Sequence, residues 1–368
     1  MFELTSSQRR ALEYINDYAK TYKDQSQVII NHILKMSNIS HDIFDYAIKN
    51  LKENMQIALH FHPDRLNSSM ITVTEALLEE GIYRNQFETL ISNGKVSPEP
   101  GGTRDLWENR IFGGAYQMNE STSNERPKYG ALNIMLNNDG PSPRFGSCYF
   151  LLSPQVSNRS TFSYLDSHQE PFERGTYDEF GMILAALLED AFSNESALGE
   201  RNIRPPKLIE HLLVHFKQES KPFINTKSSR NLNHYIEAQV HGNVFLKDDV
   251  DALVADPSFK ETEIGTYLEK ICAKYSIDLH WHSGFIMKVD DVPLNFRGPS
   301  MPSLAKRIAQ NDTIHAYALG RAVKDLHHHP ERWKDRGTFE EVLQELKLLW
   351  HVLVRYGQPY NSKNNMES

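Results

Sequence analysis

The sequence predicts an α+β fold, with a mixed or antiparallel β core between helical regions at the two ends of the chain. Residues 5–50 and 302–357 repeat apolar side chains at helical spacing. Between them, short segments alternate apolar and polar side chains with a period of two, which is typical of strands. Irregular helical insertions separate these segments, and this favours α+β over a regular series of parallel βαβ units.

The composition indicates a globular protein whose partners include neither a membrane nor, as an obligate partner, nucleic acid. The chain has 368 residues, of which 39% are hydrophobic and 24% charged, and its net charge is -8. No run of about 18 apolar residues would span a membrane. With only two cysteines we expect a cytoplasmic protein. Translocation into a host or target cell by a non-classical route is the alternative.

Residues 1–53 form the predicted helical N-terminal region. Thr5 and Gln8 have the spacing of a capping box, in which each residue satisfies a backbone N–H of the other. Ser40 precedes a second segment with one apolar helical face. This region is most simply a helical subdomain that packs on the central part of the chain.

Residues 54–295 form the predicted α+β core, which opens with a histidine-rich strand. Further strand-like segments are residues 129–136, 147–152, 159–165 and 235–241. Three helices are predicted in the core. The first carries Leu77, Leu78 and Ile82 on its apolar side. The second begins at the cap Thr176-x-x-Glu179, and the third starts after Pro205 and Pro206.

Residues 296–357 are predicted to be C-terminal helices, the last of which begins at Thr338, and residues 358–368 a disordered tail. The apolar stripes of both helical ends are narrow and regular. We therefore expect these ends to be scaffolding or partner-binding elements that carry no catalytic residue.

The histidine-rich strand is the most informative segment. Its apolar residues alternate with Ala58, His60 and His62, so that both imidazoles share one face. Pro63 ends the strand, and Arg65 comes shortly after it. Charged and acid–base side chains at a strand end predict a site, while a solvated edge strand is the plainer interpretation.

A second strand presents a carboxylate among hydrogen-bonding groups. Tyr235, Glu237, Gln239 and His241 share one face, and the residues between them are apolar. Glu237 is therefore a candidate acid, base or cation stabiliser, although a solvated strand face would show the same pattern. Thr161 lies on a third strand whose short hydroxyls could hold such groups in place.

The histidines also allow a metal site. His60 and His62 at a strand end could bind a metal together with His241, His280 or His282 and an Asp. Neither a His-Glu-x-x-His nor a Cys-x-x-Cys motif occurs, and sixteen histidines make some His-x-His pairs expected by chance.

Five motifs of the core resemble a bacterial and fungal family known only as a domain of unknown function. The resemblance covers about residues 55–290 and supplies no activity. The motifs are Leu59-His-Phe-His-Pro-Asp-Arg65, Tyr83-Arg-Asn-Gln-Phe-Glu-Thr89, Gly101-Gly-Thr-Arg-Asp-Leu-Trp-Glu108, Tyr129-Gly-Ala-Leu-Asn133 and Glu237-Ala-Gln-Val-His-Gly242.

More distantly, the chain resembles the ADP-ribosyltransferase superfamily. That superfamily has three elements in chain order: a strand whose His or Arg binds the nicotinamide ribose of NAD, a strand with a hydroxyl or aromatic residue, and a strand with a catalytic Glu. His60, His62 or Arg65 stands in the first position, Ser160-Thr161-Phe162 in the second and Glu237 in the third.

The sequence departs from that pattern at two places. Glu237-x-Gln239 stands where Gln-x-Glu or Glu-x-Glu is usual, which places arginine-directed specificity in doubt. Pro63 stands directly after the first motif, where Gly is common.

The resemblance implies an ADP-ribosyltransferase-like β core that transfers ADP-ribose from NAD, as substrate, to an unknown acceptor, with a protein as the leading candidate and a toxin or effector role as one setting. No metal is implied. A metal-dependent hydrolase and a non-enzymatic interaction module remain the alternatives. Glu237, His62 and Thr161 are the catalytic candidates. The implied NAD-binding residues are His60, His62, Arg65, Tyr83, Gln86, Phe87, Ser160 and Gln239.

Overall fold

The computed structural model describes residues 3–91, 98–118, 121–217, 222–224 and 227–360. Within these ranges the fold is a mixed α/β arrangement organised by one large sheet, as predicted. The strands of this sheet are β1 (Ile57–Phe61), β3 (Lys128–Leu132), β4 (Cys148–Leu152), β5 (Ser160–Tyr164), β6 (Arg174–Thr176), β9 (Ile236–Val240), β11 (Val250–Ala255) and β12 (Asp278–Trp281). Their order is β12-β11-β4-β1-β3-β9-β5-β6.

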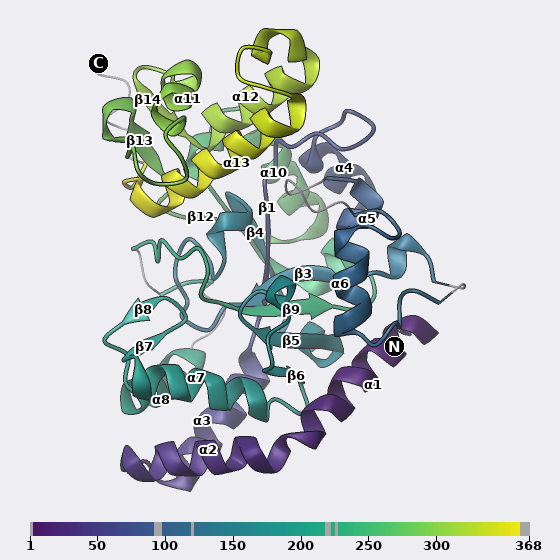
Figure 1. Cartoon of the computed structure of the whole chain (residues 1–368), viewed down its shortest axis with the longest axis vertical. Helices are drawn as coiled ribbons and strands as arrows, with labels where there is room; N and C mark the ends of the chain where they lie inside the picture. Colours follow the sequence, from purple (N-terminus) through teal and green to yellow (C-terminus); the bar gives the residue numbers. More distant parts are fainter. Residues whose placement is uncertain (1–2, 92–97, 119–120, 218–221, 225–226, 361–368) are drawn as a thin grey trace.

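The sheet divides between β1 and β3. These strands pair at only two positions, Ile57 with Leu132 and Ala58 with Ala131. Beyond Ala58, β1 continues along β4 as far as Phe61, while β3 continues along β9. Figure 1 shows the result: β1 and β4 run steeply across the direction of β3, β9 and β5. The two halves of the sheet therefore share one apolar face, but they separate toward the Phe61 end of β1, which is called the far end below.

The N-terminal helices are α1 (Ser6–Thr21), α2 (Lys23–Met36) and α3 (His41–Asn54). The two predicted N-terminal caps are confirmed, because Thr5 forms a capping box with Gln8 and Ser40 caps α3. Helix α2 packs on α7 (Gly181–Ser193) and α3 packs on α8 (Pro205–Val214), beneath the half of the sheet that holds β5 and β9 (Figure 1).

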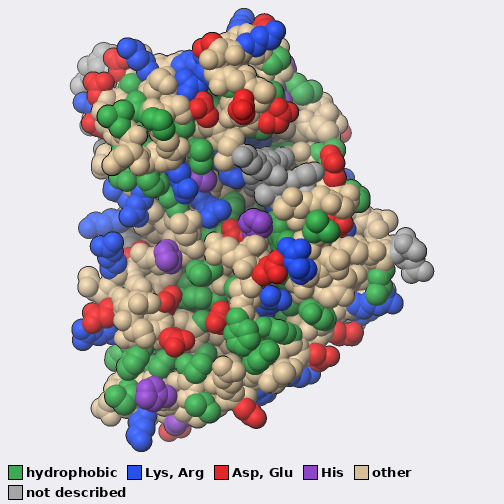
Figure 2. All heavy atoms as spheres, in the orientation of Figure 1, with side chains coloured by type: hydrophobic (Ala, Val, Ile, Leu, Met, Phe, Trp, Pro, Cys, Tyr) green, Lys and Arg blue, Asp and Glu red, His purple; other side chains and the backbone are tan. Residues whose placement is uncertain are grey.

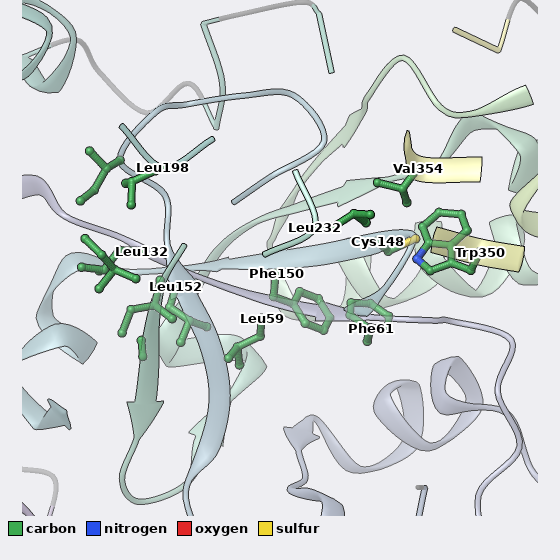
Figure 3. Packing of buried hydrophobic residues seen from close by; sticks show 14 of the residues in the cluster. Leu59, Phe61, Leu132, Cys148, Phe150, Leu152, Leu198, Leu232, Trp350 and Val354 are labelled. Carbon is green, nitrogen blue, oxygen red and sulfur yellow. The ribbon is translucent and has the colours of Figure 1, made fainter. Parts of the chain in front are cut away.

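The C-terminal helices lie at the opposite end of β1. They are α11 (Met301–Ile308), α12 (Ala316–His328) and α13 (Phe339–Tyr356). Helix α10 (Glu263–Tyr275) precedes them in the chain and packs on α4 (Val73–Glu80). Helix α13 begins at a capping box of Thr338 and Glu341, as predicted. Its Trp350 is buried and donates a hydrogen bond to the carbonyl oxygen of Pro143 over 2.9 Å. Figure 3 shows Trp350 and Val354 beside Cys148, at the end of β4.

A third group of elements flanks the opened sheet: α4 (Val73–Glu80), α5 (Gln86–Thr89) and α6 (Thr103–Ile111). The remaining short elements are β2 (Ile82–Tyr83), β7 (Ser196–Ala197), β8 (Glu200–Arg201), β10 (Val244–Phe245), α9 (Leu246–Asp249), β13 (Ile286–Lys288) and β14 (Thr313–His315).

Three local predictions are wrong. Ile82 is not on the helix with Leu77, because Gly81 adopts a left-handed conformation that ends α4, and Ile82 enters β2. Thr176 does not begin a helix: it belongs to β6, and α7 starts at Gly181. The predicted tail begins too early, because Gln358 and Tyr360 form backbone hydrogen bonds with Ile286 and Ser283. Its last residues, 361–368, lie outside the described ranges.

In the part of the chain that the structure describes, no helix is both long enough and apolar enough to cross a membrane.

Candidate functional site

A cleft of about 1180 Å³ lies where the far end of β1 meets the C-terminal helices. One wall comes from α4, β2 and α5, the opposite wall from α12 and α13, and the floor from the end of β1 and the loop before β4. Figure 2 shows Lys, Arg and His side chains gathered in the hollow below the C-terminal helices. Five of the eight predicted NAD-binding residues line this cleft: His60, His62, Arg65, Tyr83 and Gln86.

The two histidines of β1 have different environments. Both nitrogens of His60 are used, since Nδ1 lies 3.3 Å from the Gly146 carbonyl oxygen and Nε2 accepts from the Ser142 N–H at 3.4 Å. Burial lowers the pKa of His60 to about 3. His62 lies past the strand, 5.1 Å from the Trp350 ring, and its Nδ1 is 3.5 Å from the Ser147 hydroxyl. His62 is therefore the imidazole available to a ligand.

Arg65 lies at the edge of the cleft beside Asp64. Burial lowers the pKa of Arg65, and the Asp64 carboxylate opposes this. Its Nη1 is buried without a hydrogen-bond partner among the described residues. Burial raises the pKa of Asp64 to about 6, although Arg65 lowers it. Asp64 Oδ2 lies against the backbone of Gly320 in α12, which places the end of the His-Phe-His-Pro-Asp-Arg motif beside the C-terminal helices.

The structure separates three of the implied NAD-binding residues, Tyr83, Gln86 and Phe87. Tyr83 reaches the cleft, and its hydroxyl donates to the His60 carbonyl oxygen over 3.3 Å. Gln86 also lines the cleft, and its buried Oε1 has no partner among the described residues. Phe87 points away, because its ring packs under the Arg126 guanidinium at 4.6 Å. The structure therefore brings Tyr83 and Gln86 to the cleft and leaves Phe87 out.

Glu237 lies on the same face of the sheet as His60. Ala58 pairs with Ala131, and Ala131 pairs with Glu237, so these side chains point to one side. His60 is two residues along β1 from Ala58 and shares its face. Glu237 does not line the cleft and is only 5% exposed.

A chain of buried polar side chains supports Glu237. Its Oε1 accepts from the Gln239 side-chain amide at 2.9 Å, and the Gln239 Oε1 accepts from the Thr161 hydroxyl at 2.8 Å. Thr161 also lies 3.1 Å from His241 Nε2, and His241 Nδ1 lies 2.5 Å from the Tyr116 hydroxyl. Thr161 and Gln239 thus position Glu237 and do not reach the cleft.

Ser160 does not join this chain. It pairs with Val240 in the sheet, so it lies on the apolar face, opposite to Thr161. Its hydroxyl donates to the Val156 carbonyl oxygen at 2.9 Å and is fully buried. The structure therefore keeps Ser160 away from both the cleft and Glu237.

Asp166 connects Glu237 with the cleft. Burial raises the pKa of Glu237, and the Asp166 carboxylate raises it further. Asp166 accepts from the Tyr235 hydroxyl at 3.0 Å and lies 3.5 Å from Arg144 Nη2. Arg144 lines the cleft, as does Lys347 of α13. A continuous set of charged groups thus leads from the polar face of the sheet to the cleft floor.

A family model described as "Protein of unknown function (DUF3626)" matches residues 56–356. The chain belongs to the DUF3626 family. A search of curated proteins found no match.

The family match ends with the last residue of α13. The predicted coverage, to about residue 290, was therefore too short. The DUF3626 region includes both walls of the cleft, because α12 and α13 belong to it. The C-terminal helices, which we expect to be scaffolding or partner-binding elements without a catalytic residue, contribute Leu343, Gln344 and Lys347 to the lining of the cleft.

The described residues do not gather the histidines that a metal site would need. No group of three or more His, Cys, Asp or Glu side chains in those residues could hold a metal ion. His282 uses both ring nitrogens, on the Ser147 carbonyl oxygen and the Gly284 N–H. His241 is bonded within the Glu237 chain, and His60 is likewise satisfied. The hydrolase alternative therefore finds no ligand set among these imidazoles.

Sequence reasoning missed Arg144, Asp166 and Lys347. Arg144 stands in a Pro- and Gly-rich loop, and Lys347 occupies a helix whose apolar stripe suggested packing alone. Only Asp166 had a local signal, because it comes directly after the hydroxyl-rich strand. Their convergence depends on the docking of α13 on the end of β4, which no local pattern encodes.

We expect Tyr116→Phe to destabilise the fold by about 1–2 kcal/mol, because it removes the buried hydroxyl that meets His241. Tyr18→Phe is the matched control, since its hydroxyl donates to the Phe172 carbonyl oxygen at an exposed position. Chemical denaturation of both variants measures the difference. Equal, small effects would mean that the chain of polar groups contributes little.

Proposed function

We propose that this DUF3626 protein is an ADP-ribosyltransferase-like enzyme that binds NAD in the cleft and transfers ADP-ribose to an acceptor, for which a protein is the leading candidate. The observation that carries the proposal is the cleft itself. Its lining includes His62, Arg65, Tyr83 and Gln86, which the superfamily resemblance had assigned to NAD. Its volume of about 1180 Å³ exceeds that of an ordinary small-ligand pocket and suits a dinucleotide.

The polar face of the sheet supplies the second support. The proposed reaction breaks the bond between C1 of the ribose and the nicotinamide nitrogen, and the bonding electrons leave with nicotinamide. The sugar then carries oxocarbenium character until the acceptor's nucleophile bonds to C1 and loses its proton. A carboxylate held close to that sugar lowers the barrier. Glu237 is held by Gln239 within a hydrogen-bonded chain, as such a group requires.

Burial and Asp166 favour the protonated form of Glu237 in the ligand-free protein. A cationic nicotinamide ring nearby would favour the carboxylate, so that binding of NAD would itself charge the group. Because Glu237 lies behind Asp166, the ribose must pass the ion pair of Asp166 with Arg144. The proposal therefore includes a displacement of that pair on binding.

The test is direct. Purified protein is incubated with NAD, and nicotinamide release is measured by chromatography, with and without a chelator. NAD labelled in its adenosine part shows whether label passes to the enzyme or to a lysate protein. We expect chelator-resistant nicotinamide release. Absence of both NAD binding and nicotinamide release would overturn the proposal.

A further inference from the structure

One end of the cleft is an apolar slot between α4 and the C-terminal helices. Its first side is the apolar face of α4, which consists of Val73, Ala76 and Leu77. Its second side comes from α12 and α13 and consists of Val323, His327, Phe339 and Leu343. Val73, Phe339 and Leu343 are only half-buried, so part of their apolar surface is available to a ligand in the cleft.

The loop after β1 brings the two sides of the slot face to face. The N–H of Val73 donates to the Arg65 carbonyl oxygen over 2.8 Å, so α4 begins beside this loop. Asp64, in the same loop, lies against Gly320 of α12. Gly320 and His327 share one face of α12, because two helical turns separate them. The face of α12 that touches the loop is therefore also the face that lines the slot.

Phe339 gives the slot an aromatic wall at the start of α13. Its ring meets the His327 imidazole edge-on, with ring centroids 4.9 Å apart and planes at 78°. Such a pair restrains the positions of both rings. Aliphatic side chains of α4 lie on the other side of the slot. An aromatic ring on one side and aliphatic groups on the other suit a flat ligand ring, which binds by stacking and apolar contact.

The charged groups at the slot favour a neutral ligand group over an anion. Glu340 and Glu341 follow Phe339 in the first turn of α13, and both line the cleft. Burial lowers the pKa of His327 below its usual value, so the imidazole is mostly uncharged at neutral pH. Carboxylates repel a phosphate but accept hydrogen bonds from an amino group.

Two arginines of the cleft walls already have carboxylate partners. Arg84 pairs with Glu80 and with Glu88, the second at 2.8 Å. Arg336 pairs with Glu345 at 2.9 Å. Their charges are therefore balanced within the protein and do not convert the slot into a phosphate site.

The slot and His62 lie at different ends of one face of α13. His62 lies 5.1 Å from the Trp350 ring, and Trp350 is three helical turns, about 16 Å, from Phe339. Leu343 and Lys347 line the cleft between these ends. A ligand that reaches both ends must be long, as a dinucleotide is, and its two bases then occupy different ends of the cleft.

We infer that the apolar slot is an adenine-binding subsite, in which the base stacks on Phe339 and its amino group donates a hydrogen bond to Glu340. The subsite deepens the proposed function and rests on it for the identity of the ligand, NAD. It leaves the nicotinamide ribose at the other end of the cleft, where Arg144 and Asp166 lead toward Glu237. Adenine suits the slot because it is flat and neutral and carries an amino group, which an acyl chain lacks.

The test measures binding of adenosine monophosphate and of nicotinamide mononucleotide by calorimetry. Phe339→Leu keeps an apolar side chain against α12 and removes the aromatic face. We expect it to weaken binding of adenosine monophosphate about fivefold or more, and binding of nicotinamide mononucleotide less than twofold. Phe172→Leu is the matched control and should change neither, because Phe172 packs on Tyr18 and Tyr22 of α1.

Inosine monophosphate tests the hydrogen bond to the base. It carries a carbonyl oxygen in place of the amino group, so the Glu340 carboxylate should repel it. We expect the wild type to bind adenosine monophosphate about tenfold more tightly than inosine monophosphate, and Glu340→Ala to reduce this preference to less than twofold. Glu340 is exposed, so this variant should fold. An unchanged preference would overturn the binding mode.

The outcomes separate the subsite from the proposed reaction. Equal affinity of the wild type and Phe339→Leu for adenosine monophosphate would overturn the subsite even if NAD is consumed. Equal loss of both mononucleotides in Phe339→Leu would also overturn it, because Phe339 would then shape the whole cleft. Selective loss of adenosine monophosphate, at an unchanged melting temperature, would support the subsite even if the wild type releases no nicotinamide.

Discussion

Glu237→Gln is expected to lower the rate of nicotinamide release from NAD by about a hundredfold or more, the usual consequence of losing one positioned electrostatic group. The substitution keeps the shape of the side chain and can still accept a hydrogen bond from Gln239. It removes the charge that would stabilise the oxocarbenium-like sugar. Steady-state assays at saturating NAD measure the effect on kcat separately from KM.

Folding should survive this change. Burial raises the pKa of Glu237 above its unfolded value, so its protonated form is the one that the fold prefers. The stabilising contribution of the group is therefore complete below the unfolded pKa and is lost as the pH rises through the folded pKa. A neutral amide should then unfold no lower than the wild type at neutral pH. Glu189→Gln, on the exposed side of α7, is the control for the substitution itself.

Three outcomes are distinct. Full turnover in Glu237→Gln would remove Glu237 from the mechanism. Lost turnover with a lowered melting temperature would show that Glu237 and its hydrogen-bonded neighbours are needed for the stability of the fold. Lost turnover with unchanged NAD binding and an unchanged melting temperature would assign the carboxylate to the chemical step, and this is the outcome that we expect.

The local features of the fold could be predicted from the sequence because each depends on a short interval of chain. The capping boxes at Thr5 and Thr338 are confirmed, and the period-two segments become β1, β3, β4, β5 and β9. The errors arose where a tertiary contact decides the local structure. Gly81 ends α4 where Tyr275 of α10 lies against it, so Ile82 joins a strand in place of the helix.

The site could be predicted only in part, for a related reason. Period two grouped Glu237 with Gln239 on one face of β9, but only the pairing of β1 and β9 with β3 shows that His60 lies on that same side of the sheet. The alternation of faces, however, does not show which imidazole has its ring nitrogens engaged by a loop. Both ring nitrogens of His60 are engaged by the loop of residues 140–146, and a Cβ at Gly140 would lie 2.5 Å from its Nε2. The wall formed by α13 could not be predicted, because α13 and the end of β1 are separated by most of the sequence.

Gly320→Ala is expected to destabilise the protein by about 1–3 kcal/mol or more, as overpacking of a buried contact does. Gly320 lies in α12, and a Cβ there would stand 1.3 Å from Oδ2 of Asp64. The carboxylate of the His-Phe-His-Pro-Asp-Arg motif thus rests directly on the helix backbone. Chemical denaturation measures the effect. Gly181→Ala in α7 is the matched control, because its nearest neighbour, the Ser26 Cβ, is 3.8 Å away.

The double variant Asp64→Ala/Gly320→Ala tests whether the contact with Asp64 causes the loss of stability expected in Gly320→Ala. Alanine is a better helix former than glycine by about 1 kcal/mol, so without the carboxylate the Gly320→Ala change should stabilise α12. We therefore expect its effect to change sign in the Asp64→Ala background, which gives a large coupling energy between the two positions. Additive effects would mean that Asp64 does not hold the end of β1 against α12. In that case the C-terminal wall of the cleft would be held by Trp350 and its neighbours alone.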